Sequence, residues 1–396
     1  MCGVAGFLIE SKDSTQSNFE LSLRKMSEAI THRGPDDSGE WANNSDGIGL
    51  AHRRLSILDL SKAGHQPMIS SNGRFIIAFN GEIYNHQEIR TEIEDSKSSY
   101  AWKGHSDTET ILAAFQIFGI KESLKKFTGM FAFSLWDTEK KSLTLGRDRI
   151  GEKPMYYGWQ KTKRGDVFLF GSELKALKCY PEFNSKVDRG SLTLLLKHAY
   201  IPNPYSIYED IFSLEPGTIL EVSLSSKIPK IYKYWDTSKI IKNSINERFH
   251  GSPESAVHEL ENLAISAIKK QMISDVPLGA FLSGGIDSST IVSLMQTQSS
   301  IPIKTFTIGF NEKGFDEAKY AKAIAEHLGT DHTELYVNAE DALNVIPEMP
   351  SIYCEPFADP TQIPNFIVSK LASKDVKVAL SGDGGDELFG GYTRYE

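Results

Sequence analysis

Short apolar or alternating runs, bounded by Gly, Asn and Asp, recur through the first half of the chain and predict β-strands. Two stretches with apolar residues at helical spacing interrupt them, residues 19–30 and 111–118, the second behind a Ser106-x-x-Glu109 capping box. A few helices among many strands indicate a layered α+β domain. The predicted strands are 2–9, 47–57, 75–80, 130–136, 142–146, 167–170 and 218–224.

The pattern changes near residue 252. Ser252-Pro253 is typical of a helix N-cap followed by a first-turn proline, and apolar residues then recur at helical spacing up to residue 268. Beyond this helix, strand-length apolar runs alternate with helical periods, which predicts a doubly wound, mainly parallel sheet. The predicted strands are 278–282, 304–308, 333–337 and 376–380, and the predicted helices are 288–295, 316–328 and 364–372.

These two patterns divide the chain. Its 396 residues are enough for two or three domains. Residues 225–251 are mostly polar and favour a connection. We therefore expect a first domain over residues 2–218, a connecting segment over 219–254 and a second domain over 255–396.

The composition narrows the function classes. The net charge is −9 and no long run of Lys or Arg occurs, so we expect neither nucleic-acid binding nor attraction to an anionic membrane. No apolar stretch is long enough for a transmembrane helix. The three cysteines, Cys2, Cys179 and Cys354, are too few and too scattered for a disulfide framework, which is typical of a reducing, cytoplasmic compartment.

Cys2 directly follows the initiator methionine in Met1-Cys2-Gly3. If Met1 is removed, the thiol and a free α-amino group belong to one residue, which is a nucleophile with its own base. An α-amino group titrates at about pH 8, so the neutral amine is accessible in the cell. The alternative is a small packing residue at the start of a strand, which is the usual role of a single cysteine.

The predicted strand 278–282 runs into Ser283-Gly284-Gly285-Ile286-Asp287-Ser288-Ser289, which opens a helix. Glycines let backbone N–H groups approach an anion, and a helix N-terminus adds positive potential. Asp287 would be out of place beside a phosphate unless Mg²⁺ lies between them. The loop has no Lys and so is not the G-x-x-x-x-G-K-[ST] nucleotide loop. The alternative is an ordinary glycine turn.

A second glycine-rich loop, Ser381-Gly382-Asp383-Gly384-Gly385-Asp386-Glu387, follows the predicted strand 376–380. Ligands of open parallel sheets bind outside the carboxyl ends of the strands, so the two loops are expected to face one nucleotide. Asp386 and Asp287 would then form a metal pair, and Asp383 could help to position a reacting carboxylate. A solvated acidic turn is the alternative.

Several motifs together make the chain resemble a known family. Residues 283–289 resemble the pyrophosphate loop of the ATP pyrophosphatase superfamily. With residues 381–387 and the motifs of the first half, essentially the whole chain resembles the glutamine-hydrolysing asparagine synthetases. Those motifs are Cys2-Gly3, His32-Arg33-Gly34-Pro35-Asp36, Arg54-Leu55-Ser56-Ile57 and Asn80-Gly81-Glu82.

The resemblance implies a fold and a reaction. The fold is an α+β N-terminal-nucleophile amidohydrolase domain with sandwiched antiparallel sheets, followed by an α/β doubly wound parallel-sheet ATP-pyrophosphatase domain. The reaction converts L-aspartate, L-glutamine, ATP and water into L-asparagine, L-glutamate, AMP and diphosphate, with ammonia released from glutamine by Cys2. The implied partners are these small molecules, and a homodimer is the assembly considered, although the sequence does not reveal the oligomeric state.

The family also assigns roles to matching residues. Arg54 would clamp the α-carboxylate of glutamine, Glu82 and Asp107 would take its ammonium group, and Asn80 with Gly81 would form the oxyanion hole beside Cys2. Residues 32–36 would fold over bound glutamine. Asp383 would take part in acyl-adenylate formation, and Asp287 and Asp386 would hold Mg²⁺. Glutamine binding is assigned to Arg54, Ile57, Leu58, Asn80, Gly81, Glu82 and Asp107, ATP binding to Leu282, Ser283, Gly284, Gly285, Asp287, Ser288, Ser289, Ile308, Ser381 and Gly382, and the acceptor end to Glu355, Asp359 and Thr361.

Each first-half residue also has an ordinary structural explanation when taken alone. Asn80-Gly81 is typical of a hairpin turn, Arg54 of a surface charge, Asp107 of a helix cap and Glu82 of a solvated acid. Cys179 and Cys354 are expected to be buried small residues.

Other functions stay open. They are amidation of another carboxylate such as a sugar acid, hydrolysis of another amide, glutamine hydrolysis alone, and a non-catalytic binding role. The sequence ends at Glu396, where the family continues with a mostly helical section, so amide synthesis is the less secure expectation.

Overall fold

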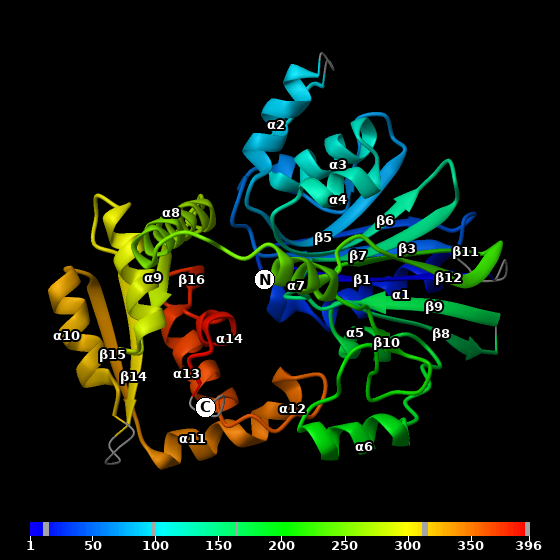
Figure 1. Cartoon of the computed structure of the whole chain (residues 1–396). Helices are drawn as coiled ribbons and strands as arrows, with labels where there is room; N and C mark the ends of the chain where they lie inside the picture. The colour runs from blue at the N-terminus through cyan, green and yellow to red at the C-terminus, as the bar shows by residue number, and fades with distance from the viewer. Residues whose placement is uncertain (11–15, 97–99, 164, 311–315, 393–396) are drawn as a thin grey trace. The chain divides into compact units, whose positions relative to one another are not determined.

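The alternating strands of the first half form two six-stranded antiparallel sheets (Figure 1). The computed structural model describes residues 1–10, 16–96, 100–163, 165–310 and 316–392. The first sheet has the order β10-β8-β9-β1-β3-β2 and the second β12-β11-β7-β6-β5-β4. The first contains β1 (Gly3–Ile9), β2 (Asp37–Asn43), β3 (Ile48–Arg54), β8 (Tyr156–Thr162), β9 (Gly165–Gly171) and β10 (Phe212–Ser213), and the second contains β4 (Met68–Ile69), β5 (Phe75–Ile83), β6 (Gly129–Asp137), β7 (Ser142–Arg147), β11 (Thr218–Ser223) and β12 (Ser226–Lys233).

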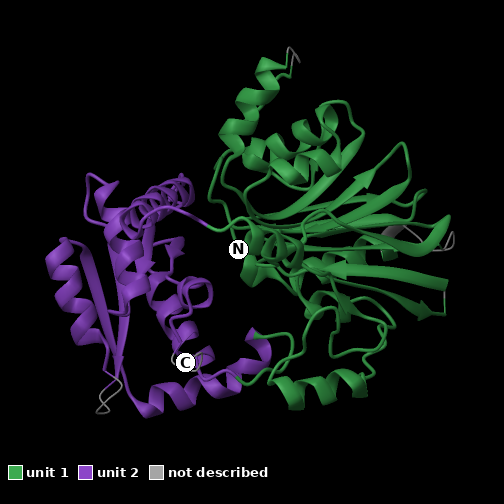
Figure 2. Cartoon of the chain, viewed as in Figure 1, with its two compact units in different colours: residues 1–248, 353–358 green, residues 249–352, 359–396 purple. Residues whose placement is uncertain are grey.

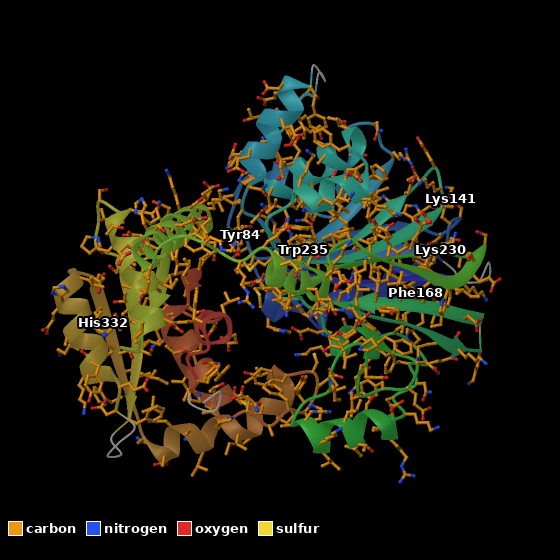
Figure 3. All side chains as sticks on the ribbon, in the orientation of Figure 1. Tyr84, Lys141, Phe168, Lys230, Trp235 and His332 are labelled. Atoms are coloured by element: carbon orange, nitrogen blue, oxygen red, sulfur yellow. The ribbon has the colours of Figure 1, made fainter. Side chains whose placement is uncertain are left out.

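The two sheets pack face to face around an apolar layer to which both contribute. Leu8 on β1, Phe168 on β9 and Trp136 on β6 are all buried in this layer. Phe168 is labelled in Figure 3. The outer faces are also apolar, and every residue of β1 is buried, as its continuous apolar sequence requires. Helices cover both outer faces, α1 (Gln16–Glu28) and α5 (Leu174–Lys178) over the first sheet and α2 (His86–Asp95), α3 (Asp107–Ile117) and α4 (Ile120–Lys126) over the second.

This arrangement confirms the expected sandwich of antiparallel sheets but corrects two details. β12 pairs with β11 in antiparallel register, so residues 219–233 continue the second sheet rather than connect domains. The capping box at α3 is half formed. Ser106 Oγ accepts from the Glu109 N–H, but the Glu109 carboxylate accepts from Lys103 and Gly104 N–H instead. The remaining short elements are η1 (Thr31–Arg33), η2 (Lys62–Gly64), α6 (Arg189–His198) and α7 (Thr237–Asn246).

The second half contains the expected parallel sheet, in the order β15-β14-β13-β16, with every pair parallel. Helices α8, α9 and α10 pack on one apolar cluster of this sheet and α13 on another, so it is covered on two sides. Its elements are α8 (Pro253–Gln271), β13 (Leu278–Phe281), α9 (Ile286–Thr297), β14 (Lys304–Phe310), α10 (Ala318–Leu328), β15 (Asp331–Val337), α11 (Ala339–Val345), η3 (Ile346–Glu348), α12 (Met349–Ile352), α13 (Gln362–Ala372), β16 (Val378–Leu380) and α14 (Gly385–Phe389).

The chain forms two compact units, and each unit consists of two separate stretches of the sequence (Figure 2). The first unit is Met1–Arg248 with Tyr353–Ala358, and the second is Phe249–Ile352 with Asp359–Glu396. Glu355 helps to attach residues 353–358 to the first unit, because its carboxylate accepts hydrogen bonds from the Tyr156 hydroxyl at 2.9 Å and the Ile207 N–H at 2.6 Å. None of the described helices is long and apolar enough to cross a membrane.

Candidate active site

A small cavity of about 50 Å³ in the first unit gathers the polar residues that the sequence singled out. It lies where the start of β1 meets β5, the loop after β3 and the first turn of α3. All eight residues predicted for the nucleophile and for glutamine line it. The complete lining is Met1, Cys2, Arg54, Leu55, Ile57, Leu58, Gln66, Phe79, Asn80, Gly81, Glu82, Ser106, Asp107, Thr108, Met130 and Lys153.

Cys2 enters the cavity because β1 begins at the next residue and is held between β3 and β9. The Cys2 Sγ faces the Leu55 carbonyl oxygen at 3.6 Å. Burial raises the pKa of the Cys2 thiol, against the pull of the nearby terminal ammonium. Burial also lowers the pKa of the Met1 α-amino group to about 6, which favours a neutral amine beside the thiol near pH 7. This value belongs to the chain that keeps Met1, and removal of Met1 would place the α-amino group on Cys2 itself, beside its thiol.

Asn80 provides an amide that lacks partners. It lies within β5 opposite Ala132 and is fully buried, and neither its Nδ2 nor its Oδ1 has a hydrogen-bond partner among the described residues. An unpaired buried amide costs about 1–3 kcal/mol, so it is typical of a group that waits for a ligand. Gly81 follows inside the same strand, where a Cβ would overlap the Met130 carbonyl oxygen. Asn80-Gly81 is therefore part of a strand and not a hairpin turn.

Two carboxylates occupy another side of the cavity. Asp107 opens α3 and accepts a hydrogen bond from the Ile83 N–H at 2.9 Å. Burial raises the pKa of Asp107 to about 6. Burial, and then the charge of Asp107, raises the pKa of Glu82 to about 7. The charges of Lys153 and of the terminal ammonium oppose the rise in the pKa of Glu82. A pair of neighbouring carboxylates is suited to receive a small cation such as an ammonium group.

Arg54 is buried at the end of β3 rather than exposed. Its Nη2 donates to the carbonyl oxygens of Leu58 at 3.0 Å and Asp59 at 2.6 Å. These bonds shape the loop that carries Ile57 and Leu58. The same guanidinium lines the cavity, so it combines a structural function with a cation at the site.

Sequence reasoning missed several lining residues. Gln66 is buried, and its side chain accepts from the Phe79 N–H at 2.7 Å and donates to Thr108 Oγ1 at 3.1 Å. Lys153 is buried, with its Nζ 2.8 Å from Met130 Sδ, and burial lowers its pKa. No local pattern marks these residues, because their places depend on contacts between distant segments.

The second unit brings its two glycine-rich loops together. They follow β13 and β16, which are neighbouring parallel strands, so both lie at carboxyl ends. A Cβ on Gly382 would lie 2.7 Å from the Ser288 nitrogen, and a Cβ on Gly385 would overlap the Asp287 carboxylate. The two loops are therefore in direct contact, and glycine is required where they meet.

The predicted nucleotide residues lie in and beneath these loops. Ser288 Oγ accepts from the Ser283 N–H at 3.2 Å, and α9 begins without a side-chain cap, which leaves its first N–H groups for a ligand. Ser381 Oγ donates to Asp383 at 2.9 Å. Leu282 is buried and Ile308 is half-buried in the apolar clusters of the sheet, so they support the loops through packing.

The two acids that the sequence predicts to hold Mg²⁺, Asp287 and Asp386, lie on these two loops. The Asp287 carboxylate lies against Gly385, whose neighbour is Asp386. No group of three or more His, Cys, Asp or Glu suited to a metal occurs among the described residues. A site with two carboxylates is nevertheless the kind that Mg²⁺ occupies beside nucleotide phosphates. Of the residues predicted for the acceptor end, Glu355 is instead bonded within the first unit, and Asp359 caps Thr361.

The fold defines an N-terminal-nucleophile amidotransferase unit joined to an ATP-pyrophosphatase-type unit. Comparison with known proteins agrees. Residues 1–235 match the glutamine amidotransferase domain family, and residues 259–396 match the asparagine synthase family.

Curated relatives match both units together. A Methanocaldococcus jannaschii protein, provisionally named glutamine-hydrolysing asparagine synthetase 2, is 38% identical over 99% of this chain and 76% of its own length. Asparagine synthetase 1 of Bacillus subtilis is 34% identical over 100% of this chain, and asparagine synthetase B of Escherichia coli is 32% identical over 99%. The chain spans 59% and 65% of the lengths of these two bacterial proteins. The chain belongs to the family of glutamine-hydrolysing asparagine synthetases.

Proposed function

We propose that this chain hydrolyses glutamine in its first unit and uses the ammonia in its second unit to convert aspartate into asparagine at the expense of ATP. The observation that carries the first step is the buried, unpaired Asn80 amide in the same cavity as Cys2. The family membership and the contact between the two glycine-rich loops support the second step.

In the glutaminase step, the Cys2 sulfur attacks the side-chain amide carbon of glutamine, and the terminal amine of the processed chain takes the thiol proton. The Asn80 Nδ2 and Gly81 N–H donate to the oxyanion, and one such donor is typically worth about 3 kcal/mol of barrier. The C–N bond breaks as the amine returns the proton to departing ammonia. Water then hydrolyses the thioester and releases glutamate.

In the synthetase step, the aspartate side-chain carboxylate attacks the α-phosphorus of ATP, diphosphate leaves, and ammonia displaces AMP from the acyl-adenylate. The N–H groups and hydroxyls of residues 283–289 would bind the phosphates, and Asp383 would help to orient the reacting carboxylate. Mg²⁺ held by Asp287 and Asp386 would neutralise phosphate charge. A homodimer and a cytoplasmic location complete the proposal. Sedimentation and fractionation test them.

The test begins with the purified chain and glutamine. We expect glutamate release, a mass for the N-terminal peptide that lacks Met1, and labelling of Cys2 by a diazo-ketone analogue of glutamine. Cys2→Ala should abolish hydrolysis while the fold is retained. Full activity in protein that keeps Met1 in every molecule would contradict the proposed base.

The second step is tested with aspartate, ATP and Mg²⁺, by measuring asparagine, AMP and diphosphate. Formation of all three with glutamine as donor supports the complete reaction. Glutamate without asparagine restricts the chain to glutamine hydrolysis, and AMP formation with another carboxylate but not with aspartate identifies a different acceptor.

A further inference from the structure

Arg33 contacts the nucleophilic residue through its backbone. The Arg33 Nε donates a hydrogen bond to the Cys2 carbonyl oxygen at 2.8 Å. Arg33 belongs to η1, directly before Gly34, whose close packing against the Arg53 backbone leaves no room for a side chain. The guanidinium is thus placed by its own backbone beside the first residue of the processed chain.

Glu173 holds this guanidinium from the other side. Its Oε1 accepts from Arg33 Nη1 at 2.9 Å and lies 2.9 Å from His32 Nε2, and its Oε2 accepts from Lys175 Nζ at 2.9 Å. Glu173 is buried. Burial alone would raise the pKa of Glu173, but the bonds from His32, Arg33 and Lys175 together hold it well below its usual range. The carboxylate is therefore charged throughout the range in which amines and thiols titrate.

Ser172, the residue before Glu173, is hydrogen-bonded to the backbone of β1. The Ser172 N–H donates to the Val4 carbonyl oxygen at 2.8 Å, and Ser172 Oγ accepts from the Val4 N–H at 3.0 Å. The start of β1 is thus fixed at Val4 by Ser172 and at Cys2 by Glu173 through Arg33. Neither Glu173 nor Arg33 lines the cavity, so neither contacts substrate there.

Glu173 also accepts a hydrogen bond from a residue far along the sequence. The Cys354 Sγ donates to Glu173 Oε2 at 3.4 Å, and Cys354 belongs to residues 353–358, which are part of the first unit. A segment embedded in the second half of the sequence thereby reaches the carboxylate that supports the nucleophile.

We propose that Glu173 is a positioning residue for the glutaminase reaction, which orients Cys2 by fixing Arg33 against the Cys2 carbonyl group. This inference rests on the proposed function. Displacement of a reacting group by about 1 Å can reduce a rate about 100-fold, so a residue outside the cavity can control the rate through orientation alone. The Cys354 bond is weak, and it adds to this support from the side of residues 353–358.

The experiment compares Glu173→Gln with a matched control, Glu92→Gln, which removes a partly exposed ion pair between Glu92 on α2 and Lys126 on α4. Glu173→Gln should reduce kcat for glutamine hydrolysis by about 10- to 100-fold and leave KM within about threefold, because substrate contacts persist. Glu92→Gln should match the parent chain.

Two electrophiles separate orientation from reactivity. A diazo-ketone analogue of glutamine must meet the thiol from one direction, so its labelling of Cys2 should slow in parallel with kcat in Glu173→Gln. Iodoacetamide is small and approaches from many directions, so its reaction with Cys2 should stay within about threefold. Equal slowing of both reagents, a change in KM alone, or a folded variant with parental kcat would each contradict the positioning role.

Glu173→Gln leaves a buried guanidinium without a carboxylate, which threatens folding. Arg33→Lys then probes the same contact from its other end and should show the same split between kcat and KM. If the parent chain itself neither hydrolyses glutamine nor is labelled at Cys2, the proposed function fails. If the parent is active and both folded variants are unaffected, only the inference about Glu173 fails.

Discussion

Asn80 and Gln66 are two buried amides on the wall of one cavity, and within the described part of the chain only Gln66 finds hydrogen-bond partners for its side chain. Replacing a side-chain amide by an apolar group of similar size costs little stability where the amide was unpaired. It costs about 1–3 kcal/mol where the former hydrogen-bond partners are left buried and unpaired. We therefore expect Asn80→Leu to reduce kcat by about 100-fold or more with little change in stability. Gln66→Leu should lower the unfolding temperature. Glutaminase assays and calorimetry check both, and a strongly destabilised Asn80→Leu would show that this amide is structural.

The raised pKa of Glu82, at about 7, predicts how glutamine binding depends on pH. An ammonium group binds the ionised carboxylate, so protons compete with it, and KM should rise roughly tenfold between pH 8 and pH 6. The pair with Asp107 titrates jointly, so the profile belongs to both acids. Initial rates across this range provide the measurement. A flat KM would exclude these acids as the ammonium site.

The same shift has a consequence for the stability of the ligand-free protein. An acid whose folded pKa lies above its unfolded value binds more protons in the folded state, so its burial destabilises the fold at high pH. This cost begins to fall as the pH drops through about 7, and it is lost below the ordinary Glu pKa of 4.5. The stabilising effect of Glu82→Gln should therefore be largest at pH 8 and vanish near pH 4. Thermal unfolding of both proteins at each pH tests this, and a stabilisation that grew on acidification would reverse the sign.

The contact between the two glycine-rich loops of the second unit predicts that ATP binding is sensitive to a side chain at residue 385. A Cβ at residue 385 would overlap the Asp287 carboxylate, so Gly385→Ala should weaken Mg²⁺-dependent ATP binding by about tenfold or more. Gly329→Ala is the matched control. Gly329 ends α10 with a φ of 71° and open space around it, so this change should cost about 1 kcal/mol of stability and leave ATP binding unchanged. Titration calorimetry with ATP distinguishes them, and equal loss in both variants would mean that general destabilisation is the cause.

The hydrogen bonds of Glu355 predict that a substitution at this residue destabilises the first unit. Its carboxylate holds Tyr156 and Ile207, so Glu355→Ala should destabilise that unit by about 1–3 kcal/mol. Exposed Glu348, only seven residues earlier in the sequence, offers a control whose change to Ala should have little effect. Hydrogen exchange of the Ile207 amide reports the loss directly, and unchanged protection would show that residues 353–358 do not stabilise this unit.

Hydrophobic pattern predicted most of the strands and the longer helices α1, α3, α8, α9, α10 and α13, because these elements bury continuous apolar faces. It missed the strands β2, β8 and β12 and the short β4 and β10. β12 is an edge strand whose residues are mostly exposed, and such a strand has little apolar signal. The eight residues predicted for the nucleophile and for glutamine came from motifs, and the structure places all eight in the lining of one cavity. Gln66, Lys153 and Glu173 were missed because their partners lie far away in sequence, and no local pattern encodes those pairings.

The exchange of residues 353–358 between the units means that the backbone passes from one unit to the other three times, after Arg248, after Ile352 and after Ala358. A protease that cuts once, after Arg248, would therefore not set free an intact amidotransferase. The liberated fragment would lack the six-residue peptide that holds Tyr156, Ile207 and Glu173. The complete first unit is therefore obtained only when this peptide accompanies residues 1–248.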